Sequence, residues 1–405
     1  MTMAALGVPA ELDLFDPDLR WDCPDLAAAR EQHWYATTPA GVCVLRYAEC
    51  AQLAADPRLG EMGTTVLAMQ GVSSGPAFDF VASSVIGVDG DAHRRLRRLA
   101  AAAFSPRRLE GVRRDARRMA GDLVEAVADR DEVDFMAAFA DVLPMRLMCR
   151  LLGIDPEHAA DLTHLVEEAG LIWSMPLADF LARVEDALMR LGRWVDSLVA
   201  ARRDRPGGDL VSVLLRGRDE EAPLTDAELR AWVISLLMGG HDDARCGLGH
   251  AVHAFATNPG QWELLGRRPE LAPAAVEEVV RFGPNVPVLY RVVREDFRYR
   301  ELDLRVGQFV GMCLALAHTD PRVFTPGFDI SVTRAEHLAF GAGAHYCIGH
   351  QLARVEMVET LRALRTRLST LEPAGDPTWR PPVGIYGPAV LPIRTRLDPG
   401  VRRRA

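Results

Sequence analysis

The sequence of 405 residues contains no lysine, so all 47 of its basic residues are arginine. The arginines occur in every kind of segment, which indicates the coding bias of a GC-rich genome rather than a functional choice. Acidic residues number 56, and the formal net charge is -9. General nucleic-acid binders carry a basic field that neutralises phosphate, so this balance argues against that class.

A membrane span, a leader and a linker are also missing from the sequence. No window reaches the roughly 20 consecutive apolar residues that a spanning helix needs. The opening residues, MTMAALGVPAELDL, have no basic stretch followed by an apolar one. These absences predict a soluble, cytoplasmic protein. Because no Ser/Gly-rich or low-complexity segment interrupts the chain, we expect one domain over residues 1–405.

Helical periodicity dominates the sequence. Apolar residues repeat at three- and four-residue intervals, which predicts helices over 107–130, 144–154, 161–173, 177–205 and 350–368. A capping-box pair, Thr225 and Glu228, starts a further helix that ends near Asn258, about 30 residues and roughly 45 Å later. Short strands and hairpins are expected over 41–47, 288–296, 297–316 and 389–397. The fold class is therefore mainly α with minor antiparallel β structure, built around one long central helix.

The seven cysteines are dispersed, with no C-x-x-C pair, and this pattern is typical of free thiols in a cytosolic chain. Cys347 differs because it lies in FGAGAHYCIGHQLAR, where small residues leave room for a flat group near the backbone. The start of the helix predicted at 350 favours a thiolate there. One alternative is a buried apolar cysteine. The other is zinc bound by His345, Cys347 and His350, but no further Cys/His pair completes that site.

The pattern F-x-x-G-x-H-x-C-x-G over residues 340–349 resembles the haem-binding signature of the cytochrome P-450 family. The resemblance implies heme b as cofactor, with Cys347 as axial thiolate ligand of the iron and His345 as a donor to a haem propionate. It places Phe340 near the sulfur, and Gly341 and Gly349 in the same cofactor-binding turn. A thiolate ligand pushes electron density onto iron and favours cleavage of a bound O–O bond.

Three other stretches resemble the same family. DAHRRLRRL carries His93 and Arg97 at positions i and i+4, where the resemblance implies propionate partners, and VPVLYRVV adds Arg291. EEVVR holds Glu278 and Arg281 at the spacing of the family's structural ion pair. A haem has two carboxylates, so its burial requires several cations from distant segments. The implied fold is that of cytochrome P-450, with the long central helix over the haem.

GGHDDAR, residues 239–245, lies in the middle of the expected central helix and aligns with the family's distal A/G-G-x-D/E-T pattern. Gly239 and the acid Asp242 keep the pattern, but Asp243 replaces the alcohol. We take these three residues as catalytic candidates. In the family, the acid and the alcohol supply protons during oxygen activation.

The replacement of the alcohol by Asp243 leaves its role open. A protonated Asp243 donates a hydrogen bond as threonine does, whereas an ionised one only accepts. Two adjacent carboxyl groups in a poorly solvated pocket resist joint ionisation, so one raised pKa is expected. His241 and Arg245 are available as partners. The alternative is that Asp243 bonds to a helix carbonyl or a water and takes no part in catalysis.

The alignment also predicts the walls of a substrate pocket. A mobile lid is expected at 78–81 and around Trp173. The aromatic residues among these positions favour a flat or aromatic substrate. The pocket-lining residues are expected to be Ser235, Met238, Val286, Val288, Leu289, Ile385 and Tyr386.

The resemblance implies an enzyme that uses O2 to oxidise a small organic molecule, and together with the coding bias it favours natural-product tailoring. With Asp243 in place of the alcohol, hydroxylation and oxidative coupling or cyclisation both stay open. The chain ends soon after the haem segment, so we expect separate ferredoxin and ferredoxin reductase partners rather than a fused reductase. We expect an acidic ferredoxin to dock on arginines near the haem; the alternative is that these arginines form a solvated helix face. They are Arg107, Arg108, Arg113 and Arg354. The alternatives are a catalytically silent haem protein that recruits partners and a peroxide-driven oxidase.

Overall fold

A computed structural model describes residues 9–16, 18–39, 41–101, 104–127, 130–216 and 224–397. The α-helices are α1 (Pro24–Gln32), α2 (Tyr47–Ala54), α3 (Thr65–Met69), α4 (Pro76–Ser83), α5 (Gly90–Ala101), α6 (Pro106–Val127), α7 (Leu143–Leu152), α8 (Ala159–Gly170), α9 (Leu181–Asp204), α10 (Leu210–Arg216), α11 (Asp226–Met238), α12 (Ala244–Thr257), α13 (Pro259–Arg267), α14 (Ala272–Phe282), α15 (Leu314–Ala317) and α16 (His350–Arg367). The segments η2 (Met136–Ala140) and η7 (Gly239–Asp243) are π-helical. Of the described helices, none is both long and apolar enough to cross a membrane.

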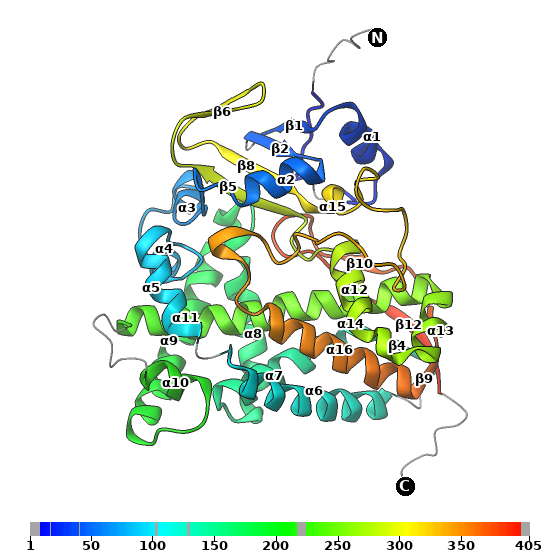
Figure 1. Cartoon of the computed structure of the whole chain (residues 1–405). Coiled ribbons are helices and arrows are strands. Elements are labelled where there is room, and N and C mark those ends of the chain that lie inside the picture. The colour runs from blue at the N-terminus through cyan, green and yellow to red at the C-terminus, as the bar shows by residue number, and fades with distance from the viewer. Residues whose placement is uncertain are drawn as a thin grey trace.

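The strands are short. They are β1 (Tyr35–Thr38), β2 (Gly41–Val44), β3 (Leu59–Gly60), β4 (Glu132–Asp134), β5 (Val288–Val293), β6 (Phe297–Tyr299), β7 (Leu302–Leu304), β8 (Phe309–Cys313), β9 (Leu368–Pro373), β10 (Thr378–Trp379), β11 (Pro388–Val390) and β12 (Pro392–Leu397). The largest sheet has the order β1-β2-β8-β5-β3 and lies at one end of the molecule, with the long helices below it in Figure 1. Its neighbours are antiparallel except β2 and β8, which are parallel. The prediction of a mainly α protein with minor antiparallel β structure is confirmed, and the β2–β8 pair is an exception to it.

The predicted long central helix is present as α11, η7 and α12, which follow one another without a break. It begins at the predicted capping box, in which Glu228 N donates to Thr225 Oγ1 (3.2 Å) and Thr225 N donates to Glu228 Oε2 (2.8 Å). It ends at Asn258, where Pro259 starts α13. Figure 1 shows this helix crossing the molecule, with α16 and α6 packed against each other beneath it.

The π-helical turn η7 coincides with the GGHDD segment, and two contacts accompany it. A Cβ on Gly240 would lie 2.4 Å from Met148 Sδ of α7, so glycine allows α7 to approach this closely. A π-helical turn takes backbone groups out of the regular helical ladder. Here Asn285 Nδ2 donates to the Asp243 carbonyl (2.6 Å). The helix therefore changes its geometry at the candidate catalytic residues.

Several predicted segments differ from the structure at their ends. The strand predicted over 41–47 ends at Val44, because α2 begins at Tyr47. The segment 297–316 contains the β6-β7 hairpin and β8, but its last residues belong to α15. The helix predicted over 107–130 is α6; its positions 128 and 129 lie outside the described residues, as do both ends of the predicted domain over 1–405.

Candidate active site

Cys347 lies in a tight turn between the 3₁₀ turn η9 (Gly343–His345) and α16. Gly341 and Gly343 have φ values of 74° and 67°, a left-handed region that glycine adopts without strain. The turn is closed by a hydrogen bond from Cys347 N to Phe340 O (2.8 Å). All seven cysteines lie in the described part of the chain, and Cys347 is the one that is exposed. The local sequence thus presents one thiol at the start of a helix.

The electrostatics of Cys347 differ from the prediction. Although Cys347 is exposed, the surrounding protein desolvates its thiol and raises its pKa to about 11, with a further increase from the Asp243 carboxyl. The Gly349 N–H, Arg97 and Arg354 act in the opposite direction. The start of α16 therefore lowers the pKa of the thiol as predicted, but desolvation outweighs this effect in the protein without haem. A bound metal cation would reverse the balance, because it deprotonates a coordinating thiol.

The predicted propionate partners from α5 reach this turn. His93 is buried, and its ring centroid lies 3.8 Å from that of His345. Arg97 donates a hydrogen bond to the Tyr346 carbonyl, next to Cys347. The buried His93 Nε2 has no hydrogen-bond partner among the described residues. Burial, together with His345 and Arg97, lowers the pKa of His93 to about 4, so its ring is neutral near pH 7.

Arg291 and His345 meet on a carboxylate that the sequence did not indicate. Arg291 Nη1 lies 2.8 Å from Glu61 Oε1, and His345 Nδ1 lies 3.6 Å from the same atom. His345 Nε2 lies 3.1 Å from Asp89 Oδ1. Burial raises the pKa of Asp89, but hydrogen bonds that include one from His345 outweigh it and lower the value to about 2. No motif in the sequence marks Glu61 or Asp89. Both residues are far along the chain from Arg291 and His345.

These residues fit a haem. Cys347 is exposed, and the buried His93 Nε2 lacks a partner among the described residues. Arg291 and His345 already share one carboxyl oxygen, which is the arrangement that a propionate requires. The donor set therefore combines a soft ligand for iron with cations for two carboxylates.

Asp242 and Asp243, although adjacent, have different surroundings. Arg380 contacts both oxygens of the buried Asp242, with Nη1–Oδ1 at 2.6 Å and Nη2–Oδ2 at 3.3 Å. Arg245 Nη1 lies 3.9 Å from Asp242 Oδ1. Arg380 follows β10, 138 residues beyond its partner. The sequence did not indicate Arg380, because its only signal there is an arginine near the predicted C-terminal pocket wall.

Asp243 is half-buried, and the described residues give hydrogen bonds to its backbone carbonyl but none to its carboxyl group. Its Oδ2 would lie 3.8 Å from a Cβ on Gly239, so this carboxyl lies over the predicted glycine. Burial raises the pKa of Asp243 to about 7, Asp242 adds to the shift and Arg380 opposes it. The Asp243 carboxyl also raises the pKa of the Cys347 thiol, so the two side chains interact electrostatically. Among described residues, no helix carbonyl binds its side chain.

The partners suggested for this acidic pair do not reach Asp243. Arg245 Nε lies 2.6 Å from Asp141 Oδ1, and its Nη1 lies 3.3 Å from Glu167 Oε1. His241 is fully buried and lies 3.9 Å from Glu167 through Nε2. Both residues therefore interact with η2–α7 and α8 rather than with the pocket.

The predicted substrate-pocket residues are only partly brought together. Val288 lies on the face of β5 opposite Arg291 and packs in a cluster with Leu14 and Leu26, and its place in the substrate pocket stays a prediction. Leu289 shares the face of Arg291. Tyr386 is buried in a stack with Trp379, with ring centroids 5.2 Å apart.

Four further predicted pocket residues lie at intermediate or low exposure. Ser235 Oγ is buried with no partner among the described residues, and Met238 is nearly buried. Val286 and Ile385 are half-buried. A Cβ on Gly384 would lie 3.8 Å from Trp173 Cβ, so the C-terminal turn and the predicted lid segment are in contact.

Glu278 and Arg281 form a fully buried ion pair, with Nε–Oε2 and Nη2–Oε1 both at 2.7 Å. Arg334 Nη2 also contacts Glu278 Oε1 at 2.9 Å, and Arg281 Nη1 donates to the His318 carbonyl (2.5 Å). This network ties α14 to the segment before the Cys347 turn. Arg334 was not identified from the sequence.

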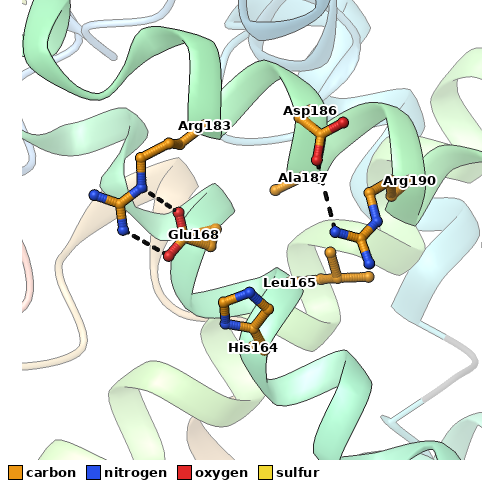
Figure 2. A pocket seen from close by; sticks show the side chains of 7 residues that line it. All are labelled: His164, Leu165, Glu168, Arg183, Asp186, Ala187 and Arg190. Carbon is orange, nitrogen blue, oxygen red and sulfur yellow. Dashed lines mark hydrogen bonds and ion pairs between the residues drawn. The ribbon is translucent and has the colours of Figure 1, made fainter.

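A separate surface pocket of about 250 Å³ lies between α8 and α9 (Figure 2). Its charged side chains are already paired: Arg183 bonds both Glu168 oxygens at 2.7 Å, and Arg190 lies 3.6 Å from Asp186. None of the predicted site residues lines it. We assign it no part in the candidate site.

Comparison with known proteins agrees with this geometry. The family model of cytochrome P450 matches residues 261–377. Luteothin monooxygenase of Streptomyces thioluteus is 41% identical over 391 residues, covering 95% of each chain. Mycinamicin IV hydroxylase/epoxidase of Micromonospora griseorubida is 33% identical over 324 residues, covering 78% of this chain and 80% of the relative. The structure of cytochrome P450 CYP109Q5 from Chondromyces apiculatus superposes with a TM-score of 0.86 at 26% identity, covering 96% of this chain and all of the other. The chain therefore has the cytochrome P450 fold and belongs to the cytochrome P450 family, whose cofactor is haem with a cysteine thiolate on the iron.

Proposed function

We propose that this protein is a haem-thiolate monooxygenase that oxidises a small natural product, with Cys347 as the axial ligand of the haem iron. The carrying observation is the exposed Cys347, held in a glycine turn at the start of α16 by its hydrogen bond to Phe340 O. The names of the two relatives, a luteothin monooxygenase and a mycinamicin hydroxylase/epoxidase, support oxidation of a natural product. When bound, haem supplies the iron at which O2 is activated.

His93, Arg97, Arg291 and His345 are proposed to hold the haem carboxylates. The unpartnered His93 Nε2 and the shared contact of Arg291 and His345 on one carboxyl oxygen support these roles. Phe340, Gly341 and Gly349 are proposed to shape the turn around the sulfur. The Arg354 guanidinium lies 4.4 Å above the Phe340 ring, which holds the aromatic ring in place.

Asp243 is proposed to deliver protons in place of the family's alcohol. Asp242 is engaged by Arg380 through both oxygens, whereas no hydrogen bond to the Asp243 carboxyl group is found among the described residues. A carboxyl group with a pKa of about 7 is partly protonated at neutral pH and regains its proton readily. Asp243 then donates a proton from its carboxyl group into the pocket over Gly239. Both hydroxylation and cyclisation of the substrate use the protons that Asp243 delivers.

The electron donor is proposed to be a ferredoxin with its reductase. Of the four arginines suggested for docking, Arg354 is bound to Glu277 (2.6 and 2.9 Å) and Arg113 to the buried Glu359 (3.0 Å). Arg108 donates to the Gly208 carbonyl (2.9 Å), and Arg107 is exposed. Arg107 is therefore the better candidate for contact with an acidic partner.

The test is turnover of luteothin by the haem-loaded protein with a surrogate ferredoxin and reductase. We expect an oxygenated or cyclised product, and a reduced carbon monoxide complex with the absorption of thiolate-ligated haem. Histidine-type absorption would refute the ligand assignment. A thiolate spectrum without turnover of luteothin or related compounds would favour the silent recruiting protein. More product with hydrogen peroxide than with the reductase system would favour the peroxide-driven oxidase.

A further inference from the structure

A second surface pocket, of about 360 Å³, lies where α4, α9 and α11 contact one another. Each helix contributes residues at the three- and four-residue spacing of one helix face. None of the residues proposed to bind the haem or to deliver protons lines this pocket, so it is a separate site. Pockets for small organic molecules enclose about 300–1,000 Å³, so this volume suits a small ligand, about the size of an amino acid.

The floor of the pocket is apolar. Phe80, Leu188 and Ile234, one from each helix, are nearly buried. Met189 also lines the pocket and is 45% exposed, although its side chain is large and apolar. A phenyl ring and a thioether both make favourable contacts with aromatic groups. The part of a ligand that fits this floor is therefore aromatic or otherwise bulky and apolar.

Two of the four charged residues that line the pocket pair with each other. Arg230 donates to both oxygens of Asp196, with Nε–Oδ1 at 3.0 Å and Nη2–Oδ2 at 2.9 Å. A Cβ on Gly192 would lie 3.1 Å from Arg230 Cδ, so this glycine allows the arginine to lie close to α9. The two charges satisfy each other, and the pair forms a neutral part of the wall.

The other two charged residues are Arg193 on α9 and Asp79 on α4. Both are exposed, and neither side chain has a hydrogen bond or an ion pair among the described residues. They line the same pocket from different helices but do not pair with each other. A cation and an anion without partners beside an apolar floor complement a ligand that carries both charges next to an apolar group.

We infer that this pocket binds a small zwitterion with an aromatic group, of the size and chemistry of an aromatic amino acid. Arg193 binds its carboxylate, Asp79 binds its ammonium group, and Phe80, Leu188 and Ile234 contact its apolar group. The inference does not depend on the proposed function, because the pocket shares no residue with the proposed haem site.

The test is calorimetric titration of the haem-loaded protein with three probes of similar shape. L-tryptophan carries both charges, tryptamine only the ammonium group and indole-3-propionate only the carboxylate. The haem iron is saturated with 4-phenylimidazole, and the haem absorption shows whether a probe displaces it. We expect L-tryptophan to bind, and each singly charged probe to bind about threefold or more weakly than L-tryptophan.

Two variants remove one charge each. Arg193→Gln should weaken the binding of L-tryptophan and indole-3-propionate by about threefold or more and leave tryptamine unchanged. Asp79→Asn should weaken L-tryptophan and tryptamine and leave indole-3-propionate unchanged. The matched control is Arg190→Gln, because Arg190 is an exposed arginine of α9 that does not line this pocket.

A third variant tests the location. Ala227→Trp fills the pocket from the exposed second position of α11, and it should abolish binding of all three probes. Its control is Ala182→Trp at the exposed second position of α9, outside the pocket. Haem spectra and thermal unfolding show that each variant is folded.

Four results would overturn the inference. The first is no binding of L-tryptophan below about 10 mM. The second is equal affinity for all three probes, and the third is unchanged binding in the Arg193, Asp79 or Ala227 variant. The fourth is displacement of 4-phenylimidazole by L-tryptophan, which would place the ligand at the haem.

Discussion

At the scale of single residues, Cys347 carries the chemistry of this protein. We predict that Cys347→Ser abolishes the thiolate-type absorption of the reduced carbon monoxide complex, because a hydroxyl does not replace the thiolate on iron. The control is Cys23→Ser, which changes a half-exposed cysteine in another segment. Retention of the thiolate band by the Cys347 variant would contradict the assignment.

Asp243 is the residue that we expect to take the place of the family's alcohol. We predict that Asp243→Asn lowers product formed per electron pair by about tenfold or more, because the amide does not release a proton. Asp243→Thr restores most of the coupling through its hydroxyl. Product is measured against consumed reductant across a pH series.

The pH dependence has a definite sign. Burial raises the pKa of Asp243 to about 7, so the donating, protonated form is present below that pH and is lost as pH rises through it. Coupling in the unaltered protein therefore falls above about pH 7, while the Asp243→Asn variant shows no such step. A step of equal size in both proteins would assign the titration to another group.

At the scale of elements, the Glu278–Arg281 pair holds α14 against the loop that precedes the Cys347 turn. We predict that Glu278→Gln lowers the free energy of unfolding by about 3–5 kcal/mol, because Arg281 and Arg334 lose their shared carboxylate in a buried site. The control Glu263→Gln breaks an exposed pair with Arg267 and should cost no more than about 0.5 kcal/mol. Denaturant unfolding measures both.

The packing of α7 on the π-helical turn is a second test at this scale. A Cβ on Gly240 would lie 2.4 Å from Met148 Sδ, so Gly240→Ala should destabilise the protein by about 1–3 kcal/mol. The double variant with Met148→Ala should lose less stability than the sum of the single variants, because the second change removes the clash. Additive losses would show that the two residues do not compete for space.

At the scale of the whole molecule, Arg380 joins the C-terminal turn to the centre of the long helix. We predict that Arg380→Met costs about 3 kcal/mol of unfolding free energy, because it leaves the buried Asp242 without its closest cation. Arg380→Lys keeps the charge and should cost less, although it loses the two-point contact. Equal stability of the Met variant and the unaltered protein would show that Arg245 suffices as the partner.

Features that depend on neighbours along the chain could be predicted from the sequence. These are the helical periodicity, the Thr225–Glu228 capping box, the glycine turn around Cys347 and the family membership that its motifs indicated. The physical reason is that caps, turns and amphipathic faces are set by residues a few positions apart. The proposed single domain over 1–405 and the roles of the site residues stay predictions.

Only the tertiary structure decided which groups meet across the fold. It paired Asp242 with Arg380 and left Asp243 without a donor, brought Glu61 to Arg291, and turned Val288 away from the face of Arg291. It also assembled the pocket between α4, α9 and α11. These partners come from segments far apart in the chain, and their meeting depends on how whole helices and sheets pack, so no local pattern in the sequence specifies it.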